Sequence, residues 1–454
     1  MRHRTPIHTP SEPTEQKSGR DGTGQFSRQW LANILRSKPL VFGLWGLVIL
    51  GVLDVVSGSS IRLERSDFTV FYASAVALRH GLDPYATDLT PIGNQFGMSL
   101  GELLHSTDTP TALAFFEPLS FLAPGKALAL WLILNAAALT AALILLLQPK
   151  YSGLSSSTAW TVAALALLYQ PTVENFAYAQ RQPLVLLLIV MTMRALKDGR
   201  EAAGGLLLAV AGAYRVFPLI IAGYLVVRRN WRALAFMVLG LIFIGTLTIA
   251  ALGLHICISY IDGIHYALID EFTIDSSNVS LRAFIVRLGW SFFGYHVDWR
   301  TRWCEQIASA LMSAAVVLIT VKATLRHRSE SAFDQRGFCL WIATAVMLSP
   351  LSWIHYMILL LIPFIAIVSA AERDKCSTRT IAALVVAYLI TSVDVVLRDK
   401  VAAGWQGLSF IFVGEFAFAC LLVGFLATYW FATDDPVRSQ PAARSLAHGT
   451  ALPR

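Results

Sequence analysis

Asp67 is the acidic residue whose place in the sequence most suggests chemistry. It comes shortly after the first long apolar segment, in the stretch 66–72. A carboxylate at the edge of a bilayer could act as a general base and take a proton from a reacting hydroxyl. An aspartate directly before a helical pattern also suits an N-cap, where its side chain accepts a backbone N–H. The local sequence leaves both interpretations open.

Arg215 is a second residue with two interpretations. It lies between two short apolar segments, in the stretch 213–218. An isolated arginine at such a place can extend its guanidinium to lipid headgroups. It can also bind a phosphate, because the planar guanidinium matches two phosphate oxygens. The sequence alone does not choose between lipid contact and ligand binding.

Three further segments place polar side chains beside apolar ones. They contain Gln182 in 170–182, Asn278 in 278–282 and His355 in 349–356. A histidine at a helix end is more often structural than catalytic, but this one shares a side with an acid, amides and arginines. Such a set indicates an anionic ligand. The sequence has no glycine-rich phosphate loop, HExxH pair or cysteine–histidine ligand set, so it predicts neither a metal nor a cofactor.

The elements that must position these residues are membrane-spanning helices. The chain of 454 residues is 56% hydrophobic and 14% charged, whereas about a quarter of the residues of soluble domains are charged. Long apolar blocks must be helical in a bilayer, because lipid offers no partners for backbone N–H and C=O groups. We therefore expect an all-α polytopic membrane protein with about twelve transmembrane helices and outward-facing juxtamembrane helices. The predicted spans are 39–58, 126–148, 158–170, 183–196, 202–213, 217–227, 233–254, 305–321, 336–349, 356–371, 380–397 and 406–431.

Basic residues fall in alternate loops between these spans. The positive-inside rule places those loops and both termini in the cytoplasm, provided that the apolar segment 111–123 does not cross the membrane. The net charge of +7 then reflects orientation rather than nucleic-acid binding. We expect a disordered cytoplasmic tail at 1–38, a transmembrane domain at 39–431 and a second cytoplasmic tail at 432–454.

The long loops 59–110 and 255–304 then face outward. Segment 67–80 is amphipathic at helical spacing and could lie on the membrane surface, and Gly81–Tyr85 is typical of a turn. A disulfide between Cys257 and Cys304 is conceivable on this face. The expected location is the inner (plasma) membrane, with the site on the periplasmic or extracellular side.

At these residues the chain resembles glycosyltransferase family 87, whose members are multi-spanning transferases of the C-type (GT-C) superfamily that use polyprenyl-phosphate sugars. The resemblance runs from about residue 40 to about residue 370. The residues that carry it are Asp67–Phe68, Tyr72, Gly81–Tyr85, Thr109–Pro110, Glu117–Leu119, Gln182, Gly199–Arg200, Arg215, Pro218, Asn278, Ser280–Leu281, Ser349–Pro350, Ser352–Trp353 and His355.

The chain departs from the family pattern at three places. The family's Gly-Gln-x-Asn is Arg181–Gln182–Pro183–Leu184 here, without the glycine and the asparagine. Its Lys-Pro-x-Pro is 215–218, which keeps a cation and loses a proline, and its double histidine is His355–Tyr356. These changes bear on the sugar and the acceptor rather than on the reaction class.

The resemblance implies a membrane hexosyltransferase, similar to the mannosyltransferases of the family. It would move a sugar from a polyprenyl-phosphate donor to a lipid or glycan acceptor, with inversion at the anomeric carbon. Asp67 would be the catalytic base. The substrate-binding residues would be Arg215, His355, Gln182, Asn278 and Tyr72. The partners would be membrane lipid, the lipid-linked donor and the acceptor, with no nucleic acid.

Two other functions stay open at this point. A transporter or flippase for a lipid-linked sugar would place charged groups inside its spans, and Asp394 and Glu415 are such groups. A purely structural membrane scaffold is the other alternative, but it gives no reason for the outward polar residues.

Overall fold

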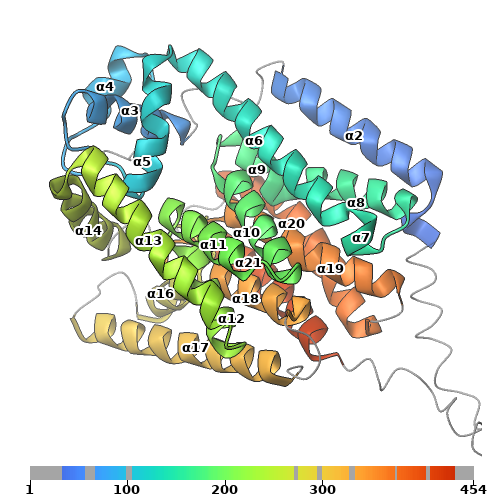
Figure 1. Cartoon of the computed structure of the whole chain (residues 1–454). Coiled ribbons are helices and arrows are strands. Elements are labelled where there is room, and N and C mark those ends of the chain that lie inside the picture. Colours follow the sequence, from blue (N-terminus) through green and yellow to red (C-terminus); the bar gives the residue numbers. More distant parts are fainter. Residues whose placement is uncertain are drawn as a thin grey trace, which may run out of the picture.

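The computed structural model describes residues 33–56, 67–98, 105–269, 275–293, 299–326, 333–373, 376–404 and 409–434. Every regular element in these ranges is a helix, and one isolated antiparallel bridge joins Asn278 to Trp353. Figure 1 shows long helices packed into a bundle, with a group of short helices at one end.

Five helices among the described residues are long and apolar enough to cross a membrane. They are α6 (Pro124–Leu147), α13 (Trp231–Leu252), Trp303–Arg326 within α17 (Trp299–Arg326), η4 (Ile354–Leu360) continued by α19 (Leu361–Glu372), and Gly414–Thr433 within α21 (Ser409–Thr433). Shorter apolar helices accompany them. The prediction of an all-α polytopic membrane protein is confirmed, and the count of twelve spans stays a prediction.

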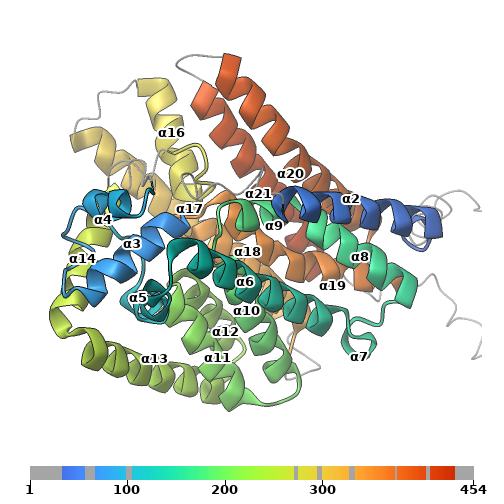
Figure 2. The same ribbon diagram turned by 90° about the horizontal axis from the view of Figure 1, so that it is seen from above.

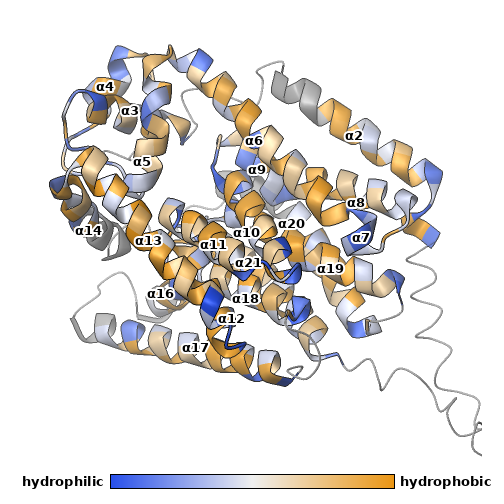
Figure 3. Ribbon diagram, viewed as in Figure 1, coloured by the Kyte–Doolittle hydropathy of each residue, from blue (hydrophilic) through white to orange (hydrophobic). Residues whose placement is uncertain are grey.

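The spans differ in how much protein covers them. In the most apolar window of Ile354–Glu372, 94% is buried, against 22% in α13 and 17% in α17. Apolar side chains therefore remain uncovered along α13 and α17, whose residues are largely orange in Figure 3. We infer that η4 and α19 form the centre of the bundle and that α13 and α17 face lipid.

Two further helices surround this centre. In α18 (Gln335–Leu348) every residue from Gly337 to Met347 is buried, and the helix packs against α17, α21 and η3 (Phe217–Ile221). Helix α10 (Gln182–Lys197) packs against α6, η4 and α11 (Glu201–Tyr214). The first two residues of α10, Gln182 and Pro183, are buried, so the protein encloses the end of the helix that carries Gln182.

Helices α11 and α13 approach each other closely at Gly205. A Cβ atom at this position would collide with the carbonyl oxygen of Ala233 and would lie 2.9 Å from the backbone nitrogen of Met237. Both obstacles are backbone atoms, so a side chain here requires the two helices to separate.

We therefore expect Gly205→Ala to lower the stability of the folded protein by about 1–3 kcal/mol, the usual cost of overpacking. Thermal unfolding of the purified protein in detergent measures the change. Gly245→Ala in α13 is the matched control, because a Cβ atom at Gly245 would meet nothing within 4 Å. Equal melting temperatures for the two variants would contradict the close approach.

The short helices form a cap over one end of the bundle. They are α3 (Phe68–Arg79), α4 (Thr90–Gln95), α5 (Pro110–Phe116) and η2 (Glu117–Phe121). Figures 1 and 2 show α3, α4 and α5 grouped together, and η2 packs against α3 and α5. They share a hydrophobic cluster with the first turns of α6. The expected surface position of segment 67–80 is wrong, because Phe68–Ala77 is buried. Its apolar face packs on protein rather than on lipid.

The apolar segment 111–123 does not form a spanning helix. Thr109 caps α5, accepting a hydrogen bond from the backbone nitrogen of Ala112 at 3.2 Å, and Pro110 occupies the first turn. Helix α5 has 7 residues and η2 has 5, far fewer than the roughly 20 needed to cross a bilayer. The prediction that this segment does not span is confirmed.

The remaining helices complete the bundle. They are α2 (Lys38–Val56), α7 (Pro149–Ser152), α8 (Ser156–Leu168), α9 (Gln170–Ala177), α12 (Ala222–Val227), α14 (Leu254–Ile269), α16 (Leu281–Phe293) and α20 (Thr378–Gly404). Figure 1 shows α2 beside α8 at the end away from the cap.

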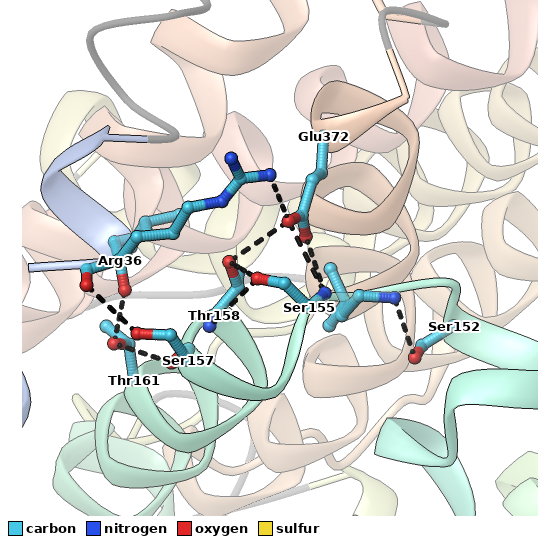
Figure 4. Close-up of polar contacts among 9 residues, drawn as sticks. Arg36, Ser152, Ser155, Ser157, Thr158, Thr161 and Glu372 are labelled. Carbon is cyan, nitrogen blue, oxygen red and sulfur yellow. Dashed lines mark hydrogen bonds and ion pairs between the residues drawn. The ribbon is translucent and has the colours of Figure 1, made fainter.

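The segment before α2 is attached to the bundle. Arg36 donates a hydrogen bond to Glu372 at 2.6 Å, and Glu372 also accepts one from the Thr158 hydroxyl at 3.2 Å (Figure 4). The Thr161 hydroxyl donates to the carbonyl of Leu35. These contacts join the entry of α2 to α8 and α19. Most of the two predicted tails lies outside the described residues.

Candidate functional site

Asp67 stands at the start of α3, facing the connection between α9 and α10. Its side chain makes no capping hydrogen bond to α3. Instead, the Gln180 amide donates to its Oδ2 atom. The N-cap interpretation therefore does not account for this carboxylate, and the general-base interpretation stays a prediction.

The surroundings of Asp67 favour proton transfer near neutral pH. Burial raises the pKa of Asp67 to about 6, and the Asp108 carboxylate adds to this rise. The guanidinium groups of Arg215 and Arg181 act in the opposite direction. A general base is most effective when its pKa is near the working pH, so the environment of Asp67 suits that role.

The segment 179–182 is held by a strained turn. Ala179 has a positive φ of 49°, which is uncommon for a residue with a side chain. The indole nitrogen of Trp131 donates to its carbonyl at 2.8 Å, and Ala179 is fully buried. This anchored turn directs Gln180 and Arg181 toward the start of α3.

Asp108 and Arg181 form a buried ion pair that sequence reasoning did not find. The Arg181 guanidinium also lies over the Phe71 ring, 4.3 Å from its centroid. Its Nε and Nη1 atoms have no partner among the described residues. The sequence contains one indication that Asp108 belongs to the site. Asp108 directly precedes Thr109–Pro110, which is among the residues that carry the family resemblance. Its partner is 73 positions away, so no local pattern could pair them.

Arg215 adds a second guanidinium to this centre. It follows the last residue of α11 in extended backbone, with φ −145° and ψ 128°. Its guanidinium lies over the Tyr356 ring, 5.5 Å from the centroid, and its Nε atom has no partner in the described part of the chain. Its positive charge acts on Asp67 and on His355. This position favours ligand binding over contact with lipid headgroups.

Buried polar atoms without protein partners surround these charges. Gln182 is fully buried, yet neither of its amide atoms is hydrogen-bonded within the described ranges, and the same holds for Nε2 of His355. Asn175 donates to the His355 carbonyl at 2.9 Å, which ties α9 to η4. Buried polar atoms are normally satisfied, so these atoms indicate a place for a ligand or water.

Asn278 is hydrogen-bonded within the protein, and its substrate-binding role stays a prediction. Its amide nitrogen donates to the Pro350 carbonyl at 3.3 Å, and its oxygen accepts from the backbone nitrogens of Ser280 at 3.1 Å and Ser352 at 3.2 Å. These bonds join the 278–280 loop to the loop before His355. The contacts favour a positioning role for Asn278 over direct substrate binding.

Tyr72 is also engaged within the protein. Its hydroxyl donates to the Leu122 carbonyl at 2.7 Å, and its ring meets Phe96 edge to face. The side chain thus holds α3 against the end of η2, and Tyr72 would act on the site by positioning Asp67.

Glu415 has a structural explanation. It accepts a hydrogen bond from Arg287 Nε at 3.1 Å, and Arg287 Nη1 donates to the carbonyls of Asp275 and Asn278. The ion pair thereby fixes the backbone that carries Asn278. This pairing removes the argument for transport that rested on Glu415, and the side chain of Asp394 lies outside the described residues.

Cys257 and Cys304 both carry free thiols, so they form no disulfide. Within the described ranges, no group of three or more His, Cys, Asp or Glu side chains could hold a metal ion.

Comparisons with known proteins agree with the resemblance seen in the sequence. The family model of glycosyltransferase family 87 matches residues 107–350, more than half of the chain. A relative in Mycobacterium tuberculosis (strain CDC 1551 / Oshkosh) is a polyprenol-phosphate-mannose-dependent alpha-(1-2)-phosphatidylinositol pentamannoside mannosyltransferase. It is 26% identical over 283 residues, which cover 60% of each protein. Asp67, Tyr72 and His355 lie outside the residues that the family model matches, so their assignment depends on the geometry above.

Proposed function

Since the chain belongs to glycosyltransferase family 87, we propose that it transfers a hexosyl group from a polyprenyl-phosphate donor to a lipid or glycan acceptor at the outer face of the membrane. Mannose is the first candidate, because the mycobacterial relative depends on polyprenol-phosphate-mannose. That relative acts on a phosphatidylinositol mannoside, which supports a lipid-linked acceptor for this chain as well.

Asp67 is the base in this proposal. Its carboxylate removes the proton of the acceptor hydroxyl as that oxygen attacks the anomeric carbon. The bond from the anomeric carbon to the phosphate oxygen breaks, and polyprenyl phosphate leaves with the electron pair. Attack opposite the phosphate inverts the anomeric centre. Phosphate is a good leaving group, so no acid is required to protonate it.

Arg215 stabilises the departing phosphate. Negative charge on the phosphate oxygens grows as the sugar leaves, and a preorganised guanidinium favours that state over the ground state. The unpartnered Nε2 of His355 and the amide of Gln182 supply hydrogen bonds to the phosphate or the sugar. Arg181 is held by Asp108, which leaves Arg215 as the cation with fewer protein contacts.

The observation that carries this proposal is a half-buried carboxylate that lies within the electrostatic reach of a guanidinium whose Nε atom is buried. Asp67 has a pKa raised to about 6, and Arg215 exerts its charge on it without forming an ion pair with it in the described structure. A base and an anion-binding group so arranged suit an acceptor hydroxyl and a donor phosphate together.

Transfer of a labelled sugar by the purified protein in vesicles tests the function. Polyprenyl-phosphate mannose, polyprenyl-phosphate glucose and a nucleotide sugar are supplied in parallel with a lipid extract as acceptor. We expect product from a polyprenyl-phosphate sugar and none from the nucleotide sugar. Movement of intact donor across the vesicle membrane without sugar transfer would support the transporter instead.

The site is expected to face outward, opposite the cytoplasmic ends of α10 and α13. Asn94 in the cap and Arg229 before α13 are both exposed, so each is suitable for single-cysteine labelling in a background without the native cysteines. An impermeant thiol reagent added to intact cells should modify Asn94→Cys and leave Arg229→Cys unmodified until the membrane is permeabilised. Modification of both from outside would overturn the proposed orientation.

A further inference from the structure

A pocket lies at the end of α10 opposite the candidate site. Its polar lining is Tyr151, Ser152, Arg194, Lys197, Gln335 and Ser369, and its apolar lining comes from α6, α10 and α19. Arg194 in this pocket lies twelve residues after Gln182 on α10, a separation of about 18 Å at 1.5 Å per residue. The pocket therefore does not belong to the site around Asp67.

Cationic side chains converge on one aromatic ring at this pocket. The Arg194 guanidinium stacks on the Tyr151 ring, and the ammonium groups of Lys150 and Lys197 lie 4.9 Å and 5.5 Å from its centroid. The Arg373 guanidinium adjoins the turn at Gly153. The bias of basic residues toward the cytoplasm explains the sign of these charges, but not their convergence on one ring.

The protein supplies little negative charge to balance this cluster. In the described part of the chain, the Asp198 carboxylate accepts from the Tyr151 hydroxyl at 3.1 and 3.2 Å, and Glu372 is engaged by Arg36. Lys197 contacts neutral oxygens, the Tyr151 carbonyl at 3.5 Å and the Gln335 side chain at 3.2 Å. Partial burial at the rim, together with the neighbouring guanidinium groups of Arg373 and Arg194, lowers the pKa of Lys197. An added anion would relieve that repulsion.

We propose that this pocket binds the phosphate group of an anionic phospholipid. Arg194 is half-buried and held by the Leu145 carbonyl at 2.8 Å and the Gln148 side chain at 2.6 Å, so its guanidinium is already oriented. Lys197 is exposed at the rim, where a headgroup can reach it. The enclosed volume is only about 20 Å³, so the phosphate binds at the rim. The lipid's glycerol and acyl part, which a soluble phosphate lacks, then lies outside the pocket against half-buried Leu145. In the orientation proposed above, this lipid belongs to the inner leaflet.

Native mass spectrometry of the purified full-length protein tests this site. The protein is titrated with phosphatidylglycerol, with phosphatidylcholine or with inorganic phosphate. We expect wild-type protein to retain phosphatidylglycerol in preference to phosphatidylcholine. Lys197→Gln should weaken that binding about fivefold, the usual effect of one basic residue near an anionic lipid surface. Lys322→Gln, an exposed change in α17, should leave it unchanged.

Arg194→Gln is the second variant, with its melting temperature checked because Arg194 also contacts the protein. A folded Arg194→Gln protein should lose phosphatidylglycerol preference to at least the same extent as Lys197→Gln. Equal retention of phosphatidylglycerol by wild type and both variants would overturn the proposal. Saturation of the site by inorganic phosphate at low millimolar concentration would overturn the assignment to a lipid. Neither result depends on sugar transfer, so the outcome is independent of the function proposed above.

Discussion

Asp67→Asn should abolish sugar transfer while the protein still folds. Removal of a general base typically lowers the rate by about 10²–10⁴-fold, and asparagine keeps the size of the side chain and an oxygen that can accept from Gln180. A carboxylate whose pKa in the folded state exceeds its unfolded value destabilises the fold while ionised at neutral pH. The neutral amide removes that cost, so we expect an unchanged or higher melting temperature.

The measurement is the rate of transfer from the preferred polyprenyl-phosphate sugar in vesicles. Asp88→Asn is the matched control, because Asp88 is an exposed carboxylate of the same cap that accepts from the Thr90 backbone at 2.8 Å. It should keep wild-type turnover. Wild-type turnover in Asp67→Asn would remove Asp67 from the mechanism.

The dependence on pH should report the same carboxylate. Because the base must be ionised, kcat/KM should be constant above the pKa of Asp67, which is about 6, and should fall tenfold per pH unit below it. In Arg215→Gln the midpoint should move to higher pH, because the Arg215 guanidinium lowers the pKa of Asp67. A midpoint near pH 4 in the wild-type protein would contradict the buried environment of Asp67.

The sequence predicted which side chains gather at the site better than it predicted what each does there. A polar residue at the boundary of an apolar segment can be recognised from the sequence alone. Four of the predicted site residues have such a place: Asp67, Gln182, Arg215 and His355. Asn278 can be recognised in the same way, but in the structure its amide forms hydrogen bonds that join two loops. Local sequence does not reveal which side chains form hydrogen bonds with distant backbone, so positioning and binding residues look alike.

The position of α3 illustrates a related limit. Its helical spacing predicted the helix, and the helix is present as Phe68–Arg79. The same spacing could not say what covers the apolar face, since a lipid headgroup layer and a protein surface both favour it. The cover comes from α5, η2 and the first turns of α6. Asp108 was missed for a comparable reason, because its partner Arg181 is brought near only by the folded chain.

Arg215→Gln should lose most of the sugar transfer, and Arg215→Lys should keep part of it. A guanidinium can bind two phosphate oxygens at once, whereas an ammonium acts as a point charge. Losing a charge-assisted hydrogen bond to a buried anion costs about 1.5–3 kcal/mol, which corresponds to about a ten- to hundredfold loss. The loss should appear in KM for the donor, in kcat or in both, since phosphate charge grows as the bond to the sugar breaks.

Binding of the product separates this role from a structural one. Polyprenyl phosphate without sugar presents the same phosphate, so it should inhibit the wild-type protein more strongly than Arg215→Gln. The control is Arg232→Gln, which removes an exposed arginine at the start of α13 and should leave both kinetics and inhibition unchanged. If Arg215 instead contacts lipid headgroups, Arg215→Gln would lower the melting temperature and leave the kinetics as they are. Unaltered donor dependence and product inhibition in Arg215→Gln would therefore exclude the phosphate-binding role, and the cation for the leaving group would then have to be Arg181.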